Sequence, residues 1–348
     1  MSELFEVKKV DKKFYEEKLK DFLPEKIIDI HTHVWTDERP REQDARTVSW
    51  PSMVAATNPI EDLLETYNLM FPGKNVTPMI FGTLPNGISL DAENEYVKDC
   101  AFKHNFPSLI FSDPAWRAEE YEKKIIEGSF LGAKSYLTMA DKNIPDDEIT
   151  IFDFFPRHQL DILDKHGWIM MLHIPRSGRL KDPKNLAQII EIDKKYPNIK
   201  LIVAHVGRAY CNEDIGNAFN ILKETQKVYF DFSANTNDWI FERLIDAVGP
   251  KRILFGSDMP ILRMRSRRII ENNAYINLVP KGLYGDVSAD SHMRELEEKE
   301  AEKITFFMYE EIDAFRRASK KTGMSSKDIE DIFYNNSKQI IDNAKDIK

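Results

Sequence analysis

Two histidines separated by one residue, His31 and His33, close the apolar run IIDI of residues 27–30. If this run forms a β-strand, its alternate side chains share a face, and the two imidazoles point in the same direction. Two neutral imidazoles arranged in this way can bind one divalent metal ion. The pair alone is equally compatible with two structural histidines at a strand end, so its meaning depends on what else the chain brings to that point.

Two further histidines follow apolar runs of the same kind. His173 comes directly after WIMML, and His205 comes directly after IKLIVA. Taken singly, each would more often be a structural histidine. The other four lie elsewhere, three in helix-like segments and one in a polar loop: His104, His158, His166 and His292. Four histidines at the ends of predicted strands favour a common site over four unrelated roles.

An acidic partner for these histidines stands in the segment RILFGSDMP, residues 252–260. Asp258 follows an apolar run and a Gly-Ser turn, where an aspartate often serves only the turn. A metal site would need an oxygen ligand, and Asp231 is the other acid that ends a strand in this part of the chain. Asp29 faces the same side as His31 but deeper, where it would orient a ligand histidine or lie as a polar residue inside the fold.

The elements that would position these residues alternate regularly. Short apolar runs alternate with longer amphipathic segments, which predicts parallel strands covered by helices. Eight runs favour a closed α/β fold, the (β/α)8 TIM barrel, over an open sheet, and no glycine-rich nucleotide-binding motif is present. In such a barrel the carboxyl ends of the strands surround the active site. The predicted strands are Ile27–Ile30, Val76–Phe81, Ser108–Phe111, Gly132–Leu137, Trp168–Leu172, Ile199–Ala204, Val228–Phe232 and Ile253–Phe255, and the predicted helices Asp91–Asn105, Ala118–Glu127, Phe154–His166, Asn185–Tyr196, Gly216–Thr225 and Asp238–Val248.

The remaining segments depart from a minimal barrel, although the whole chain is predicted to be one domain. The long connection 36–75 after the first strand is predicted to be a cap over the barrel mouth. The other departures are a helical lead-in at residues 1–25, an insertion after the last strand at 260–300, and closing helices at 301–348, the second of which begins at the Ser325–Ser326 cap.

The composition narrows the classes of partner. A formal net charge of −9 disfavours a nucleic-acid partner, because phosphate binding usually shows as a basic surface. A small anionic substrate remains compatible, since a local arginine cluster can outweigh the global field. Cys100 and Cys211 do not make a disulfide framework. The charged N-terminus lacks a signal-peptide core and no stretch approaches the ~18 apolar residues of a membrane span, so the predicted location is the cytoplasm.

Five motifs carry a resemblance to a known family: IDIHTHVW, FLGAKSYL, MLHIPRSGR, KLIVAHVGR and RILFGSDMP, in this order over almost the whole predicted barrel. The sequence resembles the amidohydrolase superfamily, and within it the branch that includes aminocarboxymuconate-semialdehyde decarboxylase, related aromatic-acid decarboxylases and sugar-lactone hydrolases. The resemblance implies one divalent metal ion, zinc in the first instance with manganese or iron as alternatives. Its implied ligands are His31, His33, His173 and Asp258. By the same resemblance, His205 acts beside the metal in mononuclear members and binds metal in dinuclear ones.

Lys134, in GAKSYL, bears on the number of metal ions. Dinuclear members carry a carboxylated lysine in the corresponding run, where it bridges two metals. Mononuclear members also have a lysine there, without a bridging role. A lysine that pairs with a carboxylate or contacts the substrate is therefore the alternative, and we predict a single metal ion.

The predicted reaction follows from the ligand set. Three imidazoles and a carboxylate leave a coordination position open for water or a substrate oxygen. Asp258 would accept a proton from that activated water, and His205 would stabilise charge or exchange protons. We therefore expect a metal-dependent hydrolase that acts on a C–O or C–N bond of a small carboxylated or lactone substrate. The alternatives are a nonoxidative decarboxylase built from the same parts and a non-catalytic barrel that binds a small molecule.

Arginines gather after the predicted strand ends, where a guanidinium would suit a substrate carboxylate. We expect Arg176, Arg179, Arg208, Lys134 and Trp35 to contact the substrate. For each one alone, a solvated loop charge or core packing is the plainer interpretation. Weaker candidates are Arg263, Arg265, Trp50, Trp116, Tyr136, Tyr210 and Asn235. The apolar segment 306–309 would serve either a homodimer contact or the core.

Overall fold

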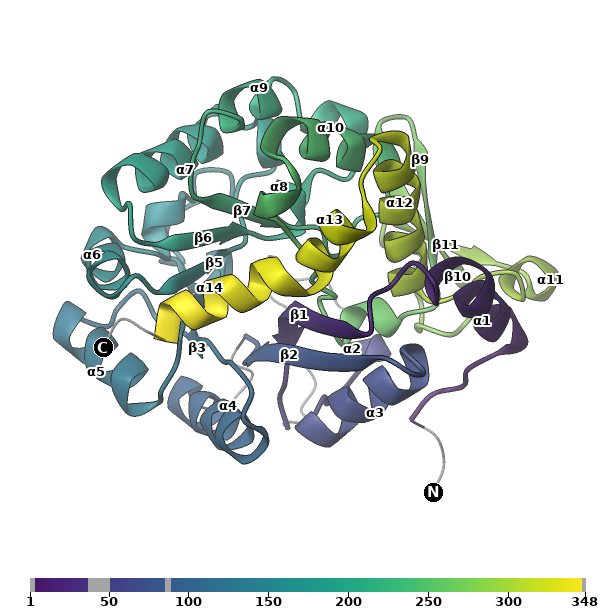
Figure 1. The fold of residues 1–348 in the computed structure, drawn as a ribbon, viewed down its shortest axis with the longest axis horizontal. Coiled ribbons are helices and arrows are strands. Elements are labelled where there is room, and N and C mark those ends of the chain that lie inside the picture. The colour runs from purple at the N-terminus through teal and green to yellow at the C-terminus, as the bar shows by residue number, and fades with distance from the viewer. Residues whose placement is uncertain (1–3, 37–50, 85–88, 346–348) are drawn as a thin grey trace.

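The centre of the molecule is a ring of eight parallel strands, seen in a computed structural model that describes residues 4–36, 51–84 and 89–345. The strands are β1 (Lys26–His33), β2 (Asn75–Phe81), β3 (Ile110–Phe111), β4 (Gly132–Ser135), β5 (Ile169–Leu172), β6 (Lys200–Val203), β7 (Val228–Asp231) and β8 (Ile253–Leu254). β3 to β8 form one sheet in chain order, and β1 pairs with β2. Parallel bridges join Ile80 to Ser108 and Thr32 to Met259. These bridges close the ring, which confirms the predicted barrel. Figure 1 shows β1 beside β2, and β5, β6 and β7 beside one another.

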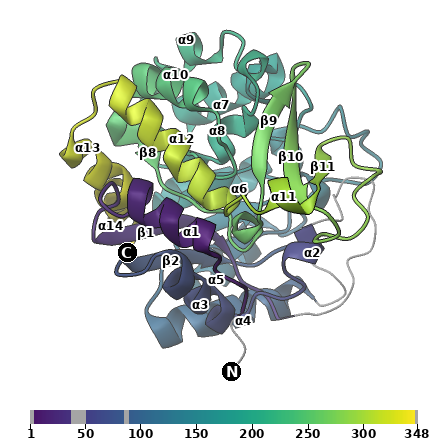
Figure 2. The same cartoon turned by 90° about the vertical axis from the view of Figure 1, so that its right-hand side faces the viewer.

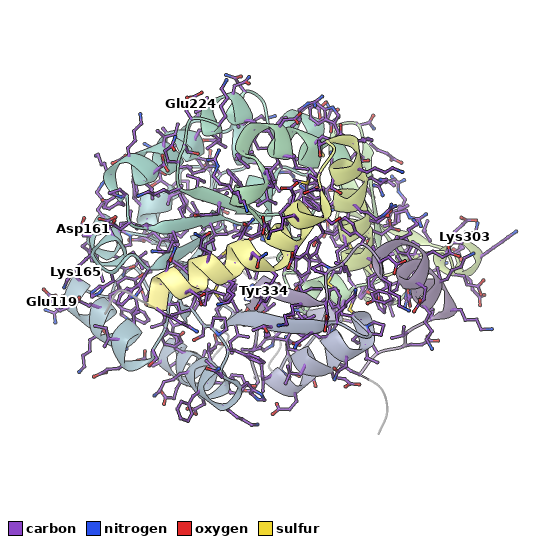
Figure 3. The ribbon with its side chains drawn as sticks, in the orientation of Figure 1. Glu119, Asp161, Lys165, Glu224, Lys303 and Tyr334 are labelled. Atoms are coloured by element: carbon purple, nitrogen blue, oxygen red, sulfur yellow. The ribbon has the colours of Figure 1, made fainter. Side chains whose placement is uncertain are left out.

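Helices cover the outside of the barrel and turn charged side chains such as Glu119, Asp161 and Lys165 to the surface (Figure 3). Asp182 caps α7 just before its first residue, a proline, and this satisfies free N–H groups at the helix end. The helix expected over 216–225 is shorter than predicted. The covering helices are α3 (Ile60–Met70), α4 (Leu90–His104), α5 (Ala118–Glu127), α6 (Arg157–His166), α7 (Pro183–Lys195), α9 (Ala218–Leu222) and α10 (Asp238–Val248).

Of the C-terminal helices, α14 (Asn336–Lys345) closes the amino-terminal end of the barrel. α12 (Phe307–Lys321) packs against α10, α13 (Ser326–Glu330) begins after the Ser325 cap as predicted, and α14 lies across the barrel (Figure 1). Ile340 and Ile341 of α14 belong to the same buried cluster as Ile30 of β1. Burial of these apolar side chains plugs that end. The open mouth is therefore at the carboxyl ends of the strands.

The connection 36–75, predicted to be a cap, is described only in part, and the cap stays a prediction. α3 lies within it, between β1 and β2, and covers the outside of the barrel as an ordinary helix (Figure 1). Its Tyr67 is buried, and the hydroxyl donates to Asp29 of β1 at 2.8 Å. The segment also contains the short helix α2 (Pro51–Val54). Residues 37–50 of the expected cap, including Trp50, lie outside the described residues.

The predicted insertion 260–300 folds into a small three-stranded sheet (Figure 2). β9 (Arg267–Glu271) and β10 (Ala274–Pro280) form an antiparallel hairpin, and β11 (Met293–Leu296) pairs with β10 in parallel before α11 (Glu298–Ala301). Asn272 and Asn273 turn the hairpin with φ of 49° and 61°. Asparagine tolerates this left-handed conformation, which a two-residue hairpin turn requires.

The helical lead-in is present as α1 (Lys9–Phe14), which a π-helical turn (Tyr15–Leu19) extends. Its buried Asp11 accepts two hydrogen bonds from Arg265, at 2.8 and 2.7 Å. Arg265 therefore ties the insertion to the lead-in and does not point to the barrel mouth, contrary to the prediction. The segment 306–309 is buried in the core of the chain rather than exposed for a dimer contact. In the part of the chain that the structure describes, no helix has the length and apolar character needed to cross a bilayer.

Candidate active site

A pocket of about 370 Å³ opens at the carboxyl ends of the strands. Many of the residues predicted from the sequence line it together, although they come from five different strand ends: His31, His33, Trp35, Lys134, His173, His205, Arg208 and Asp258. The walls also contain aromatic rings, among them Tyr136, Tyr210, Tyr275 and Phe307. The barrel thus assembles a polar centre inside a wall of aromatic and aliphatic side chains.

The closest group of ligand atoms consists of two imidazole nitrogens and one carboxylate oxygen. Asp258 Oδ1 lies 3.4 Å from His31 Nε2 and 3.5 Å from His33 Nε2. Strand β1 presents both histidines from one face, as the His-x-His spacing predicts. Gly256 lets β8 approach, because a Cβ there would lie 2.8 Å from the Cβ of His31. The absence of a side chain at this position therefore allows the close approach of the strands that supply the imidazoles and the carboxylate.

Hydrogen bonds on the far side of each ring decide where its lone pair points. His31 Nδ1 donates to Asp231 at 3.0 Å, and His33 Nδ1 donates to the Gly82 carbonyl at 2.8 Å. Burial lowers the pKa of both imidazoles, so each is neutral at pH 7 and keeps a lone pair on Nε2. Among the described residues, His31 Nε2 is buried without a hydrogen-bond partner. Two lone pairs facing one carboxylate oxygen repel it unless a cation lies between them, so this set fits a divalent metal ion.

Asp231, at the end of β7, connects His31 to His205. It accepts from His31 through one oxygen and from the His205 backbone N–H, at 2.9 Å, through the other. Although burial opposes it, the imidazoles of His31 and His205 hold the pKa of Asp231 below its usual value. Ser233 Oγ donates to Asp231 and accepts from His205 Nδ1 at 2.8 Å. His205 therefore also carries its proton on Nδ1 and leaves Nε2 with a lone pair.

His205 stands at the start of a strained turn. Residues 205–208, assigned as α8 (His205–Arg208), have φ between 50° and 61°, a left-handed conformation that only Gly207 adopts without cost. Asp258 also has a positive φ, 52°. Such strain persists where the surrounding structure holds it, and it concentrates at functional sites. Here it directs the side chains that follow β6 and β8, on either side of β7, into one pocket.

His173 lies in the same pocket but apart from the closest group. Its Nε2 is 3.2 Å from the Tyr136 hydroxyl, and its Nδ1 is buried without a partner among the described residues. The sets of donor atoms within 4.8 Å of one another, in the described part of the chain, are His31 with His33 and Asp258, and His31 with His205 and Asp231. His173 belongs to neither set. Its role as a ligand stays a prediction.

Lys134 is buried at the end of β4, with its Nζ 5.6 Å from the centre of the Phe81 ring. Burial lowers its pKa to about 8, against the opposing effect of Asp258 and Asp231. No carboxylate lies within 4.0 Å of its Nζ in the described residues. The structure therefore places Lys134 in the pocket as an ammonium ion at pH 7, and its carboxylation stays untested.

The predicted arginines divide into structural and pocket residues. Arg176 pairs with Asp182 and Arg179 with Asp214, and neither belongs to the pocket wall as described. Arg263 donates to the Val54 carbonyl, also away from the wall. Arg208 does line the pocket, anchored by three backbone carbonyls, the nearest that of Pro175 at 2.8 Å.

Sequence reasoning missed the pocket residues Arg268, Tyr275 and Phe307. The only signal was the basic stretch MRSRR, residues 264–268, whose positions could not be told apart without the hairpin. Of the weaker candidates, Tyr136 and Tyr210 line the pocket, whereas Asn235 donates to the Ala209 carbonyl and Trp116 packs against the core. Trp35 lines the pocket and donates from Nε1 to the Ala56 carbonyl.

Asp29 does not contact a histidine ring, and Asp231 holds His31 instead. Asp29 accepts from the backbone N–H groups of Ser257 and His31, at 2.9 and 3.3 Å, and from Tyr67. Its contacts join β1, α3 and the turn that carries Asp258. Of the two expected roles, contact with a ligand histidine ring is not observed, and Asp29 is a buried polar residue between β1 and α3.

A closed parallel barrel with imidazoles and a carboxylate at its carboxyl-terminal mouth is the arrangement of an amidohydrolase-type enzyme. The family model described as amidohydrolase matches residues 28–304, and the chain belongs to this family. The match extends from the first histidine motif to the end of the inserted sheet. No curated protein sequence is significantly similar to the chain.

Solved structures agree with this assignment at the level of the fold. One is 5-carboxyvanillate decarboxylase from Sphingomonas paucimobilis, with 13% identity and a TM-score of 0.56 over 92% of this chain and 99% of that one. A probable 2-pyrone-4,6-dicarboxylic acid hydrolase from Acinetobacter baumannii shows 13% identity and a TM-score of 0.54 over 91% and 99%. A dihydroxybenzoic acid decarboxylase from Polaromonas, with bound manganese, shows 15% identity and a TM-score of 0.52. That match covers 92% of this chain and 97% of the decarboxylase.

Proposed function

We propose that this protein is a metal-dependent hydrolase that cleaves a C–O or C–N bond of a small carboxylated compound or lactone. The observation that carries the proposal is the convergence of His31 Nε2, His33 Nε2 and Asp258 Oδ1 in the pocket, with no proton available to bridge the two imidazoles. The family assignment supports it, because it holds for the whole stretch that supplies these residues.

His31, His33 and Asp258 would hold the ion, with His173 from the same pocket as a further ligand. When bound, a divalent ion polarises the bond to be cleaved and lowers the pKa of a water molecule. Zinc is the proposed ion, with manganese and iron as alternatives, since imidazole and carboxylate ligands accept all three. The manganese in the similar Polaromonas enzyme supports this range.

The chain's own residues would move the protons. Although burial opposes it, the nearby histidines His33, His205 and His31 lower the pKa of Asp258, so its carboxylate is ionised and can accept a proton from the attacking water. Burial lowers the pKa of His205 to about 4, so its free Nε2 is a neutral base at pH 7. Lys134 and Arg208 would bind the anionic part of the substrate.

The second candidate is a nonoxidative decarboxylase of a small unsaturated or aromatic carboxylic acid. Two observations favour it. The pocket has aromatic walls and three cations without an ion-pair partner in the described residues, Lys134, Arg208 and Arg268. Two of the similar solved structures are decarboxylases of aromatic acids.

The test gives the metal-loaded protein matched panels of lactones and of unsaturated or aromatic carboxylic acids. Acid release is followed in a pH-stat in parallel with CO2 release. We expect acid release without CO2 for a hydrolase, whereas CO2 release selects the decarboxylase. Asp258→Asn is expected to lower turnover by roughly 10²–10⁴-fold, and Asp286→Asn, on an exposed loop, should not. A metal-loaded wild type that turns over neither panel would contradict both candidates.

A further inference from the structure

The β9–β10 hairpin brings a charged side chain to the pocket that the barrel strands do not supply. Arg268 of β9 lies opposite Asn277 of β10 in the hairpin register, and its guanidinium lines the pocket. Its Nε donates to Asn277 Oδ1 at 2.9 Å, and its Nη1 donates to the Ala234 carbonyl at 2.6 Å. These bonds fix two of the three nitrogens. In the described residues, Nη2 has no hydrogen-bond partner.

Three aromatic rings enclose this guanidinium. Its central carbon lies 4.4 Å from the ring centre of Tyr275, 4.6 Å from that of Phe307 and 4.8 Å from that of Tyr210. Contacts at these distances stabilise a cation and restrict its rotation. The rings come from three separate parts of the chain, β10, α12 and the loop after β6. Arg268 is therefore held in one position before any ligand arrives.

The charge of Arg268 is not neutralised within the described structure. Arg179 approaches the same two tyrosines, with its guanidinium carbon 5.3 Å from each ring centre, but it pairs with Asp214 at 2.6 Å. No carboxylate lies within 4.0 Å of Arg268 among the described residues, and Asp258 is the one acid on the pocket wall there. A partly buried guanidinium without a counter-ion is costly, and a bound anion would compensate for it.

This cation is separate from the group proposed to hold the metal ion. Arg268 contacts Tyr210, Tyr275 and Phe307, whereas Asp258 contacts His31 and His33. One pocket thus offers two places for negatively charged groups. A monoanion whose anionic group lies at the reacting centre would leave Arg268 without a partner.

We propose that Arg268 determines substrate specificity by binding a second carboxylate, one that takes no part in the reaction, and that the natural substrate is a small dicarboxylate. This proposal rests on the pocket being the active site of the proposed function. The planar guanidinium offers a fork that suits a carboxylate, and its aromatic surroundings favour a flat, unsaturated carbon frame between the two acid groups.

The experiment measures ligand binding by calorimetry, without turnover. The probes are isophthalate, benzoate and monomethyl isophthalate, which share a ring and differ in the number of free carboxylates. The variants are Arg268→Met and Arg268→Lys, with Arg267→Met as the matched control, because Arg267 is the exposed neighbour on the same strand and pairs with Glu310. Thermal melting identifies any variant that fails to fold. If Arg268→Met is one of them, the charge-retaining Arg268→Lys provides the test of the proposal.

Wild type is expected to bind isophthalate at least ~10-fold more tightly than either monoacid. Arg268→Met should remove this preference for the diacid and change the affinity for benzoate less than about twofold. Arg268→Lys should keep part of the preference, and Arg267→Met should keep all of it. Equal affinity of wild type for the diacid and the monoacids overturns the proposal. The proposal is also overturned if Arg268→Met loses affinity for the diacid and for the monoacids by the same factor. If Arg268→Met does not fold, a full diacid preference in Arg268→Lys overturns it.

Repeating the titrations after chelation separates this inference from the proposed function. The loss of isophthalate affinity in Arg268→Met is expected to persist without metal, because Arg268 contacts none of the proposed ligands. Failure of the proposed function would show instead as absence of a bound ion or of turnover in wild type, with this effect of Arg268→Met intact. If chelation abolishes the effect of Arg268→Met on isophthalate binding, the assignment to Arg268 is contradicted.

Discussion

At the scale of single residues, the site depends on which nitrogen of each imidazole carries a proton. Asp231 and the Gly82 carbonyl accept from the Nδ1 atoms of His31 and His33 and so leave both Nε2 atoms as electron-pair donors. The His-x-His spacing predicts the pair correctly. It does not identify Asp231 as the acceptor, because that contact joins residues 200 positions apart, and Asp29, nearer in sequence, was the apparent candidate.

The Asp231–His31 contact gives the first prediction. Asp231→Asn removes the negative charge behind the imidazole, and partners of this kind typically contribute a factor of roughly 10–100 to metal affinity. We expect a loss of that size in a metal titration by calorimetry. Asp29→Asn is the matched control, since Asp29 is equally buried but touches only the backbone of His31. Equal losses in the two variants would show that the effect is general destabilisation.

Lys134 gives a pH-dependent prediction. Its pKa is lowered by burial to about 8, so the ammonium ion is present below that pH and lost above it. Binding of an anionic substrate should therefore weaken as pH rises through about 8, seen as a rising KM. In Lys134→Met the KM should be higher at pH 7 and flat across this range. A wild-type KM that stays constant from pH 7 to 9 would contradict a substrate-binding role for the ammonium group.

At the scale of elements, the strand ends carry the chemistry and the turns after them aim it. The alternation of apolar runs and helical segments was sufficient to predict the eight strands, because each strand is buried on both faces. The left-handed turn at His205–Arg208 could not be predicted from the sequence HVGR, because Gly207 is the only residue there that favours a left-handed conformation. The hairpin β9–β10 was missed because its strand RRIIE is largely exposed and lacks an apolar run.

Gly207 tests this turn. A Cβ there would lie 2.5 Å from the Leu180 side chain, and φ is 61°, so Gly207→Ala adds a clash to the cost of the left-handed backbone. We expect a loss of about 2–4 kcal/mol in the free energy of unfolding by urea, with reduced turnover because Arg208 and His205 shift. In Gly323→Ala, where φ is 70° and nothing lies within 4 Å, only about 1 kcal/mol is expected. A Gly207→Ala protein no less stable than Gly323→Ala would refute this account of the turn.

At the scale of the whole molecule, contacts between distant segments hold the pocket wall. Arg265 was predicted at the rim from its place after β8, yet it binds Asp11 of the lead-in across 254 positions, and Thr305 donates to the same carboxylate at 2.8 Å. Such pairing leaves no local pattern in the sequence. It anchors the insertion from which Arg268 and Tyr275 reach the pocket.

Removing the acid of this buried pair leaves the guanidinium without a counter-ion. Asp11→Ala is therefore expected to lower the free energy of unfolding by roughly 3–5 kcal/mol, measured by urea denaturation. Glu17→Ala, which removes an exposed ion pair with Lys13 on the same lead-in, should cost under about 1 kcal/mol. Similar small losses in both variants would mean that the lead-in does not support the insertion.

The central claim is that distant strand ends surround one cation. Anomalous diffraction from crystals of protein purified without added metal tests it most directly. The predicted result is a single peak about 2.0–2.3 Å from His31 Nε2, His33 Nε2 and a carboxylate oxygen of Asp258, and the same map would show whether His173 completes the set. Fully ordered side chains at these positions with no peak among them, or a peak held by other residues, would contradict the account.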